Sequence, residues 1–187
     1  MQEDVNDQIE MAKIEMDDTI NHLSRELTKI RAGKASPAAL EGIMVDYYGA
    51  PTPLNQVANI STPDAKTLSI QPWEKKMIGA VEQAIFAANI GLTPMNNGEM
   101  VMINIPPLTE ERRKEFVKRA KSLGEDAKVS LRSARHKVMD FIKKAVKDGY
   151  PEDMGKRKED EVQKLVNSYG DKVNALVKTK ENDIMTI

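Results

Sequence analysis

Seven side chains between positions 114 and 135 repeat at steps of three or four residues, and six of them are basic. They are Lys114, Lys118, Lys121, Glu125, Lys128, Arg132 and Arg135. Residues at this spacing lie along one side of a helix, so the sequence predicts a track of positive charge opposite the apolar stripe of that helix. Such a track neutralises several phosphates together and binds nucleic acid in a salt-dependent way. An arginine within it can hold a phosphate through two hydrogen bonds. Four neighbouring basic residues are expected to widen the track: Arg112, Arg113, Arg119 and Lys137.

A solvated helix surface is the alternative explanation for the same residues, and the distribution of charge bears on the choice. The net charge of the chain is only −1, but residues 1–30 carry −5, residues 108–147 carry +7 and residues 148–187 carry −2. This segregation favours a binding role for the basic segment. No zinc knuckle or aromatic pair on a sheet suggests recognition of bases, so we expect contacts to the nucleic-acid backbone and shape.

The other reactive residue types give little support for an enzyme. The chain has no cysteine, which excludes disulfides, Cys-ligated metals and thiol chemistry, and His22 and His136 lie in distant segments. Gly33-Lys34-Ala35-Ser36 is similar to the end of a phosphate-binding loop, but Thr28 stands where the first glycine is needed. We therefore expect no catalytic residue, no metal and no cofactor. A small enzyme built on residues 34–104 is the weakest alternative.

Three long segments must position the basic residues. Apolar side chains recur at steps of three and four over residues 3–30, 108–148 and 152–185, which predicts three amphipathic helices that bury their stripes against one another. The first helix is expected to end near Ala32-Gly33, where Gly33 caps it. Gly124 and Gly170 fall inside the other two, each at a cost of about 1 kcal/mol relative to alanine. Close helix packing is the one explanation that the sequence offers for them.

The pattern between the first two helices is different. Alternation at 43–48 predicts a strand, residues 49–53 are expected to break the chain, and further strands are expected around 54–60, 67–71 and 100–105. A helix is expected over 74–89, and Asn97-Gly98 predicts a hairpin turn. The predicted fold class is therefore α+β: an elongated three-helix bundle made of residues 1–30 and 108–187, with a small α/β domain inserted at 34–104. The two connections, at about 31–33 and 104–107, are expected to act as hinges.

Four segments carry a resemblance to a known family. They are KIRAGKASP at 29–37, VDYYGAPTPL at 45–54, PPLTEERRK at 106–114 and residues 129–135. In this order they are highly specific, and the chain resembles the ribosome recycling factor family over essentially its whole length. The resemblance implies an L-shaped, tRNA-like molecule whose long arm is the bundle. It also implies a protein that is not an enzyme and that splits the post-termination ribosome into subunits together with elongation factor G and GTP, which releases mRNA and tRNA.

The resemblance also assigns roles to residues. Arg132 stands at the family's arginine that contacts ribosomal RNA (rRNA), and the spacing of the track adds Lys128 and Arg135 to it. Lys121, Lys118, Arg112 and Arg113 complete the expected rRNA-binding set. The residues that match the family's hinge are Arg31, Ala32, Gly33, Ile105, Pro106 and Pro107.

The expected partners are the 70S ribosome, large-subunit rRNA and elongation factor G, with no membrane and no small-molecule substrate. The protein is expected to be cytoplasmic, because the acidic N-terminus lacks a signal sequence and no apolar run approaches the roughly 20 residues of a membrane helix. It is also expected to be a monomer. The alternative from another class is a helical adaptor that binds proteins and whose basic face is only solvated.

Overall fold

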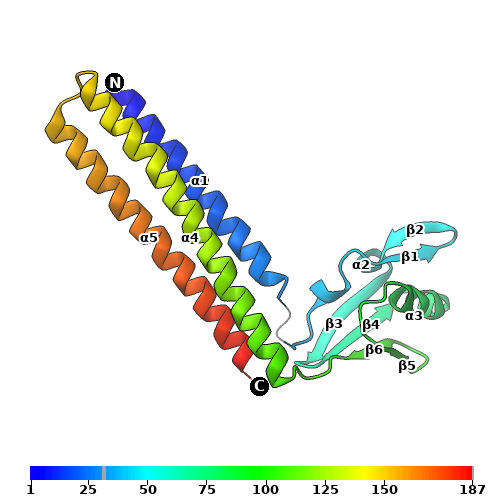
Figure 1. The fold of residues 1–187 in the computed structure, drawn as a ribbon. Coiled ribbons are helices and arrows are strands. Elements are labelled where there is room, and N and C mark those ends of the chain that lie inside the picture. Colours follow the sequence, from blue (N-terminus) through cyan, green and yellow to red (C-terminus); the bar gives the residue numbers. More distant parts are fainter. Residues whose placement is uncertain (31–32, 187) are drawn as a thin grey trace. The chain divides into compact units, whose positions relative to one another are not determined.

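The computed structural model describes residues 1–30 and 33–186. They form two compact units, each with its own hydrophobic core: a helical unit from residues 1–30 and 110–186, and a small unit from residues 33–109. Figure 1 shows the long helices of the first and the sheet of the second. The predicted α+β fold class is confirmed.

The helical unit is a three-helix bundle of α1 (Gln2–Thr28), α4 (Glu110–Lys147) and α5 (Glu152–Met185). The helices run side by side (Figure 1), and α4 packs against both of the others. The apolar stripes predicted from the sequence meet in one continuous core, which includes Met16, Leu23, Leu131, Ile142 and Val173. None of the three helices could bury its stripe alone, so the bundle is held together mainly by this shared burial.

The helix boundaries differ from expectation at two ends. The first helix ends at Thr28 and not near Ala32-Gly33, because the N–H groups of Lys29 and Ile30 turn back to carbonyls only three residues earlier and the buried Ile30 follows at once. Ala32 lies outside the described residues. The helix α4 begins at Glu110, two residues later than the expected start at 108.

Close helix packing accounts for one of the two unusual glycines. A Cβ placed on Gly124 would lie 2.6 Å from Cγ2 of Val177, so α4 and α5 approach each other there at a distance that only glycine allows. For Gly170 the same explanation is wrong, because a Cβ placed there would meet nothing within 4 Å.

The small unit contains two antiparallel sheets. The first is the hairpin of β1 (Met44–Tyr47) and β2 (Ala50–Pro53), and the second has the order β3-β4-β6-β5, formed by Ala58–Asp64, Thr67–Pro72, Val101–Asn104 and Pro94–Asn96. The helix α3 (Ile78–Ala87) buries Ile78, Val81 and Ile85 in the same core as Leu68 and Ile103. Three short helical segments complete the unit: η1 (Pro37–Leu40), α2 (Leu54–Val57) and η2 (Lys75–Met77).

Two local predictions for the small unit are wrong. Residues 49–53 do not break the chain, because Tyr48 and Gly49 both adopt positive φ, which forms a tight hairpin turn into β2. The strand expected around 54–60 begins only at Ala58, since Leu54 and Val57 are buried together on one side of the helical turn α2. The predicted hairpin turn at Asn97-Gly98 is confirmed between β5 and β6, with Gly98 at φ 89°.

Candidate nucleic-acid interface

The basic track lies on the flank of α4 that borders α5, and not opposite the buried stripe as expected. Lys128 and Arg132 line a groove together with residues of α5. Nε of Arg135 donates a hydrogen bond to Oε1 of Gln163 at 2.8 Å, and Nζ of Lys121 lies 4.0 Å from Glu181. Because α4 packs against two helices, side chains next to its buried stripe fall at the edge of an interhelical groove.

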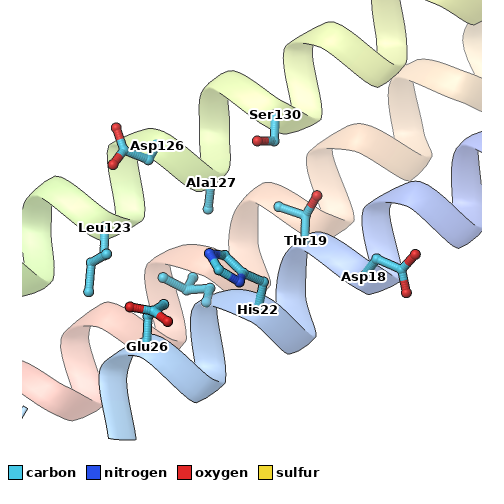
Figure 2. A pocket seen from close by; sticks show the side chains of 9 residues that line it. Asp18, Thr19, His22, Glu26, Leu123, Asp126, Ala127 and Ser130 are labelled. Carbon is cyan, nitrogen blue, oxygen red and sulfur yellow. The ribbon is translucent and has the colours of Figure 1, made fainter. Parts of the chain in front are cut away.

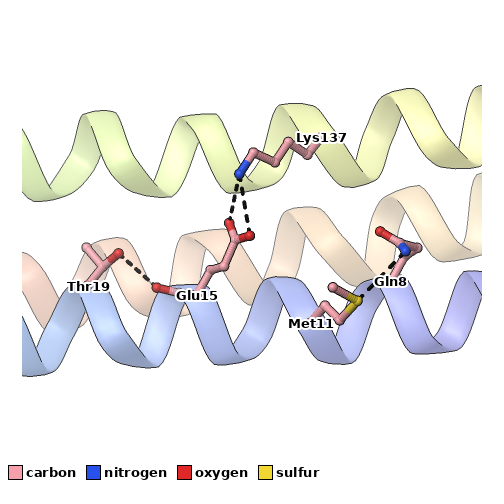
Figure 3. A network of polar contacts seen from close by, with 5 residues as sticks. All are labelled: Gln8, Met11, Glu15, Thr19 and Lys137. Atoms are coloured by element: carbon pink, nitrogen blue, oxygen red, sulfur yellow. Dashed lines mark hydrogen bonds and ion pairs between the residues drawn. The ribbon is translucent and has the colours of Figure 1, made fainter.

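Three of the four residues that were expected to widen the track do not extend this flank. Arg112 lies twenty positions before Arg132, which places the two side chains about 160° apart around the helix. Arg113 is half-buried and donates to the carbonyl oxygen of Met185 at 3.3 Å. Lys137 lies on the other side of α4, where its ammonium group contacts Glu15 of α1 at 3.4 Å (Figure 3).

Much of the positive charge on the track already has a carboxylate near it. Lys114 pairs with Glu110 at 3.4 Å, and Lys128 pairs with Glu125 at 3.6 Å. Exposed pairs of this kind contribute at most about 1 kcal/mol, so a phosphate can replace the carboxylate at little cost. Within residues 1–30 and 33–186, Arg132 and Lys118 have no ion pair, and both are exposed. Arg132 is therefore a guanidinium that is free to bind an anion beside a groove.

The opposite flank of α4 has a groove of contrary charge, which α4 shares with α1. Figure 2 shows Asp18, His22 and Glu26 of α1 around it, with Asp126 and Ser130 of α4 across from them. A hydrogen bond from Lys29 lowers the pKa of the Glu26 carboxyl, which keeps it ionised. With three carboxylates and no Lys or Arg in its lining, this groove repels phosphate, whereas the groove toward α5 includes the cations Lys128 and Arg132 beside the single carboxylate of Asp171.

The described part of the chain offers little to other classes of site. Over residues 1–30 and 33–186, no group of three or more His, Asp or Glu side chains is placed to hold a metal ion. His136 is exposed, with Nε2 3.3 Å from Asp140. None of the helices described is long and apolar enough to cross a membrane.

Of the expected hinge residues, Arg31 and Ala32 lie outside the described residues, and the other four lie within the small unit. Gly33 has φ 74°, and a Cβ placed on it would lie 2.9 Å from Cγ of Leu108. Both connections are fastened to the turn between β3 and β4: Ala35 N–H donates to the carbonyl of residue 65 and Ile105 N–H to that of residue 66, each at 2.7 Å. Pro106 and Pro107 follow and are exposed.

Sequence reasoning missed two clusters. The hydroxyl groups of Tyr47 and Tyr48 donate to the two carboxylate oxygens of Glu74, at 2.9 and 2.6 Å, which lowers the pKa of Glu74 and raises the pKa of both tyrosines. In the sequence these adjacent tyrosines indicate a strand and belong to one of the family segments, but nothing there points to Glu74 as their partner. The second cluster is the α5 side of the basic groove, whose members Asn167, Gly170, Asp171 and Asn174 have the helical spacing that could have revealed it.

A helical bundle with one cationic flank defines a candidate RNA-binding protein. A family model described as "Ribosome recycling factor" matches residues 23–185. The chain belongs to the ribosome recycling factor family, and the resemblance found in the sequence is confirmed.

Similar proteins match along their full lengths. The chain is 53% identical over 179 residues to the ribosome-recycling factor of Christiangramia forsetii, covering 96% of each chain, and 50% identical over 187 residues to that of Flavobacterium johnsoniae, covering all of both. A solution structure of the ribosome recycling factor is 33% identical with a TM-score of 0.76, covering 98% of each chain. A second neighbour belongs to models of the T. thermophilus ribosome recycling factor and the E. coli elongation factor G bound to the E. coli post-termination complex. It is 37% identical with a TM-score of 0.63, covering 97% of this chain and 99% of that one.

Proposed function

We propose that this protein recycles ribosomes. It binds the post-termination 70S ribosome and, with elongation factor G and the GTP that this partner hydrolyses, splits it into subunits and releases mRNA and tRNA. Its bacterial relatives are ribosome-recycling factors, and one structural neighbour is described bound to a post-termination complex together with elongation factor G. The chain makes and breaks no covalent bond itself, and it acts as a monomer in the cytoplasm, where bacterial ribosomes work.

The α5 flank of α4 is the proposed contact with large-subunit rRNA. Arg132 lies at its centre, and the supporting cations are Lys118, Lys121, Lys128 and Arg135. The observation that carries this assignment is the exposed, unpaired Arg132 beside a groove on the cationic flank of the helix. Arg112 and Arg113 precede the track in α4, and they are proposed to contact a separate part of the rRNA next to the N-terminal end of the track.

Movement between the two units is the proposed source of force. Elongation factor G would displace the small unit while the helical unit stays on the rRNA, and the chain would bend at Arg31, Ala32 and Gly33 and at Ile105, Pro106 and Pro107. Two observations support this proposal: the units have separate cores, and the anchoring bonds of both connections go to one turn of the small unit.

Light scattering of purified post-termination ribosomes tests the function. A fall in scattering should need this protein, elongation factor G and GTP together. The control is a known recycling factor that splits the same ribosomes with the same elongation factor G. If scattering then does not fall with this protein and the protein does not bind large subunits, the proposal is wrong. If scattering does not fall but the protein binds large subunits, the elongation factor G used is a mismatched partner.

Binding to isolated large subunits tests the site. Arg132→Ala removes a charge-assisted contact worth about 1.5–3 kcal/mol, so binding should weaken roughly 10- to 150-fold. The matched control is Lys137→Ala, which removes a positive charge from the other flank and should bind as the wild type does. Binding that is insensitive to salt and to Arg132→Ala would favour the helical adaptor instead.

A further inference from the structure

We propose that the groove between α4 and α5 receives one unpaired nucleotide of the rRNA, with its phosphate on Lys128 and Arg132 and its base lying over Gly170. This inference rests on the proposed function and specifies what the basic flank recognises. It differs from the expectation from the sequence, in which RNA contacts were limited to backbone and shape.

The groove combines an apolar floor with a cationic side and a polar side, which is what a nucleotide requires. Leu131 is buried and Val166 half-buried, and they supply an apolar floor between the helices. Lys128 and Arg132 supply cations on the α4 side, while the α5 side is polar. A second groove continues from it along the same helix pair and shares Lys128 and Asn174 with it. A strand of RNA that follows this line meets mostly cations on the α4 side, and on the α5 side amide groups, the cation of Lys178 and the carboxylates of Asp171 and Glu181.

A chain of hydrogen bonds sets which way the α5 amides face. Nε of Arg135 donates to Oε1 of Gln163, and Nε2 of Gln163 donates to Oδ1 of Asn167 at 2.9 Å. A guanidinium group can only donate, so it fixes the orientation of the Gln163 amide, and Gln163 in turn occupies the oxygen of Asn167. The amide nitrogen of Asn167 is left as a donor at the groove.

The groove also contains an acceptor, which argues for a base and not for phosphate alone. Asp171 lines the same groove and is exposed. Phosphate oxygens only accept hydrogen bonds, and a carboxylate repels them. The edge of a base carries both donors and acceptors, so Asp171 together with Asn167 matches a base edge.

Gly170 has no structural explanation within the bundle. A Cβ placed on it meets no atom within 4 Å, although Gly124 nearby is required by packing. Glycine is unfavourable inside a helix. Its position in the lining of the groove leaves bare backbone there, over which a flat base can lie closely.

The contrast between the two flanks of α4 favours an anionic occupant on the α5 flank, and the proposed function makes that occupant RNA. The groove toward α1 is lined by Asp18, Glu26 and Asp126, without Lys or Arg. The groove toward α5 carries Lys128 and the unpaired Arg132. An anion is therefore directed to one groove of the two.

Two substitutions test the inference by binding to isolated bacterial large subunits. Gly170→Ala should raise the melting temperature, because alanine favours the helix and meets no obstacle, and it should still weaken binding. Asn167→Asp replaces the donor with a negative charge and should also weaken binding. A lost or obstructed contact with one nucleotide should weaken binding roughly 5- to 150-fold, which corresponds to about 1–3 kcal/mol. Asn21→Asp, the same change at an exposed position of α1, should bind as the wild type does.

The outcomes separate this inference from the function on which it rests. If the wild type binds and Arg132→Ala weakens binding, but Gly170→Ala and Asn167→Asp bind normally, the nucleotide site is wrong and the proposed function stands. If the wild type does not bind large subunits, the proposed function fails first.

Crosslinking gives a second, independent test. The chain has no cysteine, so Asn174→Cys provides a single attachment point for a short photo-crosslinker, and Asn21→Cys is its control. A crosslink from position 174 to an unpaired rRNA nucleotide is the expected result. Crosslinks only to paired RNA or to ribosomal protein would overturn the inference.

Discussion

At the scale of single residues, Tyr169 is the clearest link between two helices of the bundle. Its hydroxyl group on α5 donates a hydrogen bond to the carboxylate of Asp17 on α1, and Nζ of Lys172 lies 4.5 Å from the centre of its ring. Burial, together with the bond to Asp17, raises the pKa of Tyr169 to about 12. The folded protein therefore keeps this proton at a pH where the unfolded chain has lost it.

This shift predicts an alkaline loss of stability. An ordinary tyrosine has a pKa of about 10, so below pH 10 both states hold the proton and above it only the folded state does. The free energy of unfolding should then fall by up to about 1.4 kcal/mol per pH unit until the pKa near 12 is reached. Tyr169→Phe should be less stable by about 1.5–3 kcal/mol at pH 7, through the lost bond to a charged group. Urea unfolding of the wild type and of Tyr169→Phe between pH 7 and pH 12 measures the free energy of unfolding of each. If the difference between the two proteins does not shrink above pH 10, Tyr169 is not the group responsible for the alkaline loss of stability.

At the scale of elements, the spacing between α4 and α5 depends on Gly124. Gly124→Ala gains about 1 kcal/mol of helix propensity, but its Cβ would lie 2.6 Å from Cγ2 of Val177. A valine in a helix has essentially one χ1 rotamer and cannot turn away. The cost of overpacking, about 1–3 kcal/mol, should therefore exceed the gain in helix propensity and destabilise the protein. The melting temperature of each variant measures the change in stability.

The double variant Gly124→Ala with Val177→Ala is the control, and it should be more stable than Val177→Ala alone because the obstructing methyl groups are gone. A Gly124→Ala protein that melts above the wild type would contradict the close approach of α4 and α5.

The long elements were predictable from the sequence and the short ones were not. A stripe that recurs over more than twenty residues fixes a helix whatever surrounds it, which is why α1, α4 and α5 were found. The short segments β2 and α2 depend on two positive φ angles at Tyr48-Gly49 and on burial by neighbours, and neither leaves a periodic signal. For the candidate site, spacing identified Lys128 and Arg132 as neighbours on one side of α4. It could not tell which helix borders that side, and it therefore missed the groove residue Asn167.

At the scale of the whole molecule, the two hydrophobic cores share no residue. Leu131 is buried in the helical unit, and Ile70 is buried in the sheet of the small unit. Each unit therefore has its own source of cooperativity, and local stability can differ between them. We expect hydrogen exchange to give one free energy of opening for peptides of α4 and another for peptides of β4.

Core truncations test this independence, because a large-to-small substitution costs about 2–5 kcal/mol at the site where it is made. Leu131→Ala should lower the protection of peptides throughout α1, α4 and α5 and leave β4 and β6 unchanged. Ile70→Ala should do the reverse, and each variant serves as the control for the other. Hydrogen exchange followed by mass spectrometry reads both units in one sample. If either variant lowers protection equally in both units, they unfold as one body, and a mechanism that moves the small unit while the helical unit stays in place loses its basis.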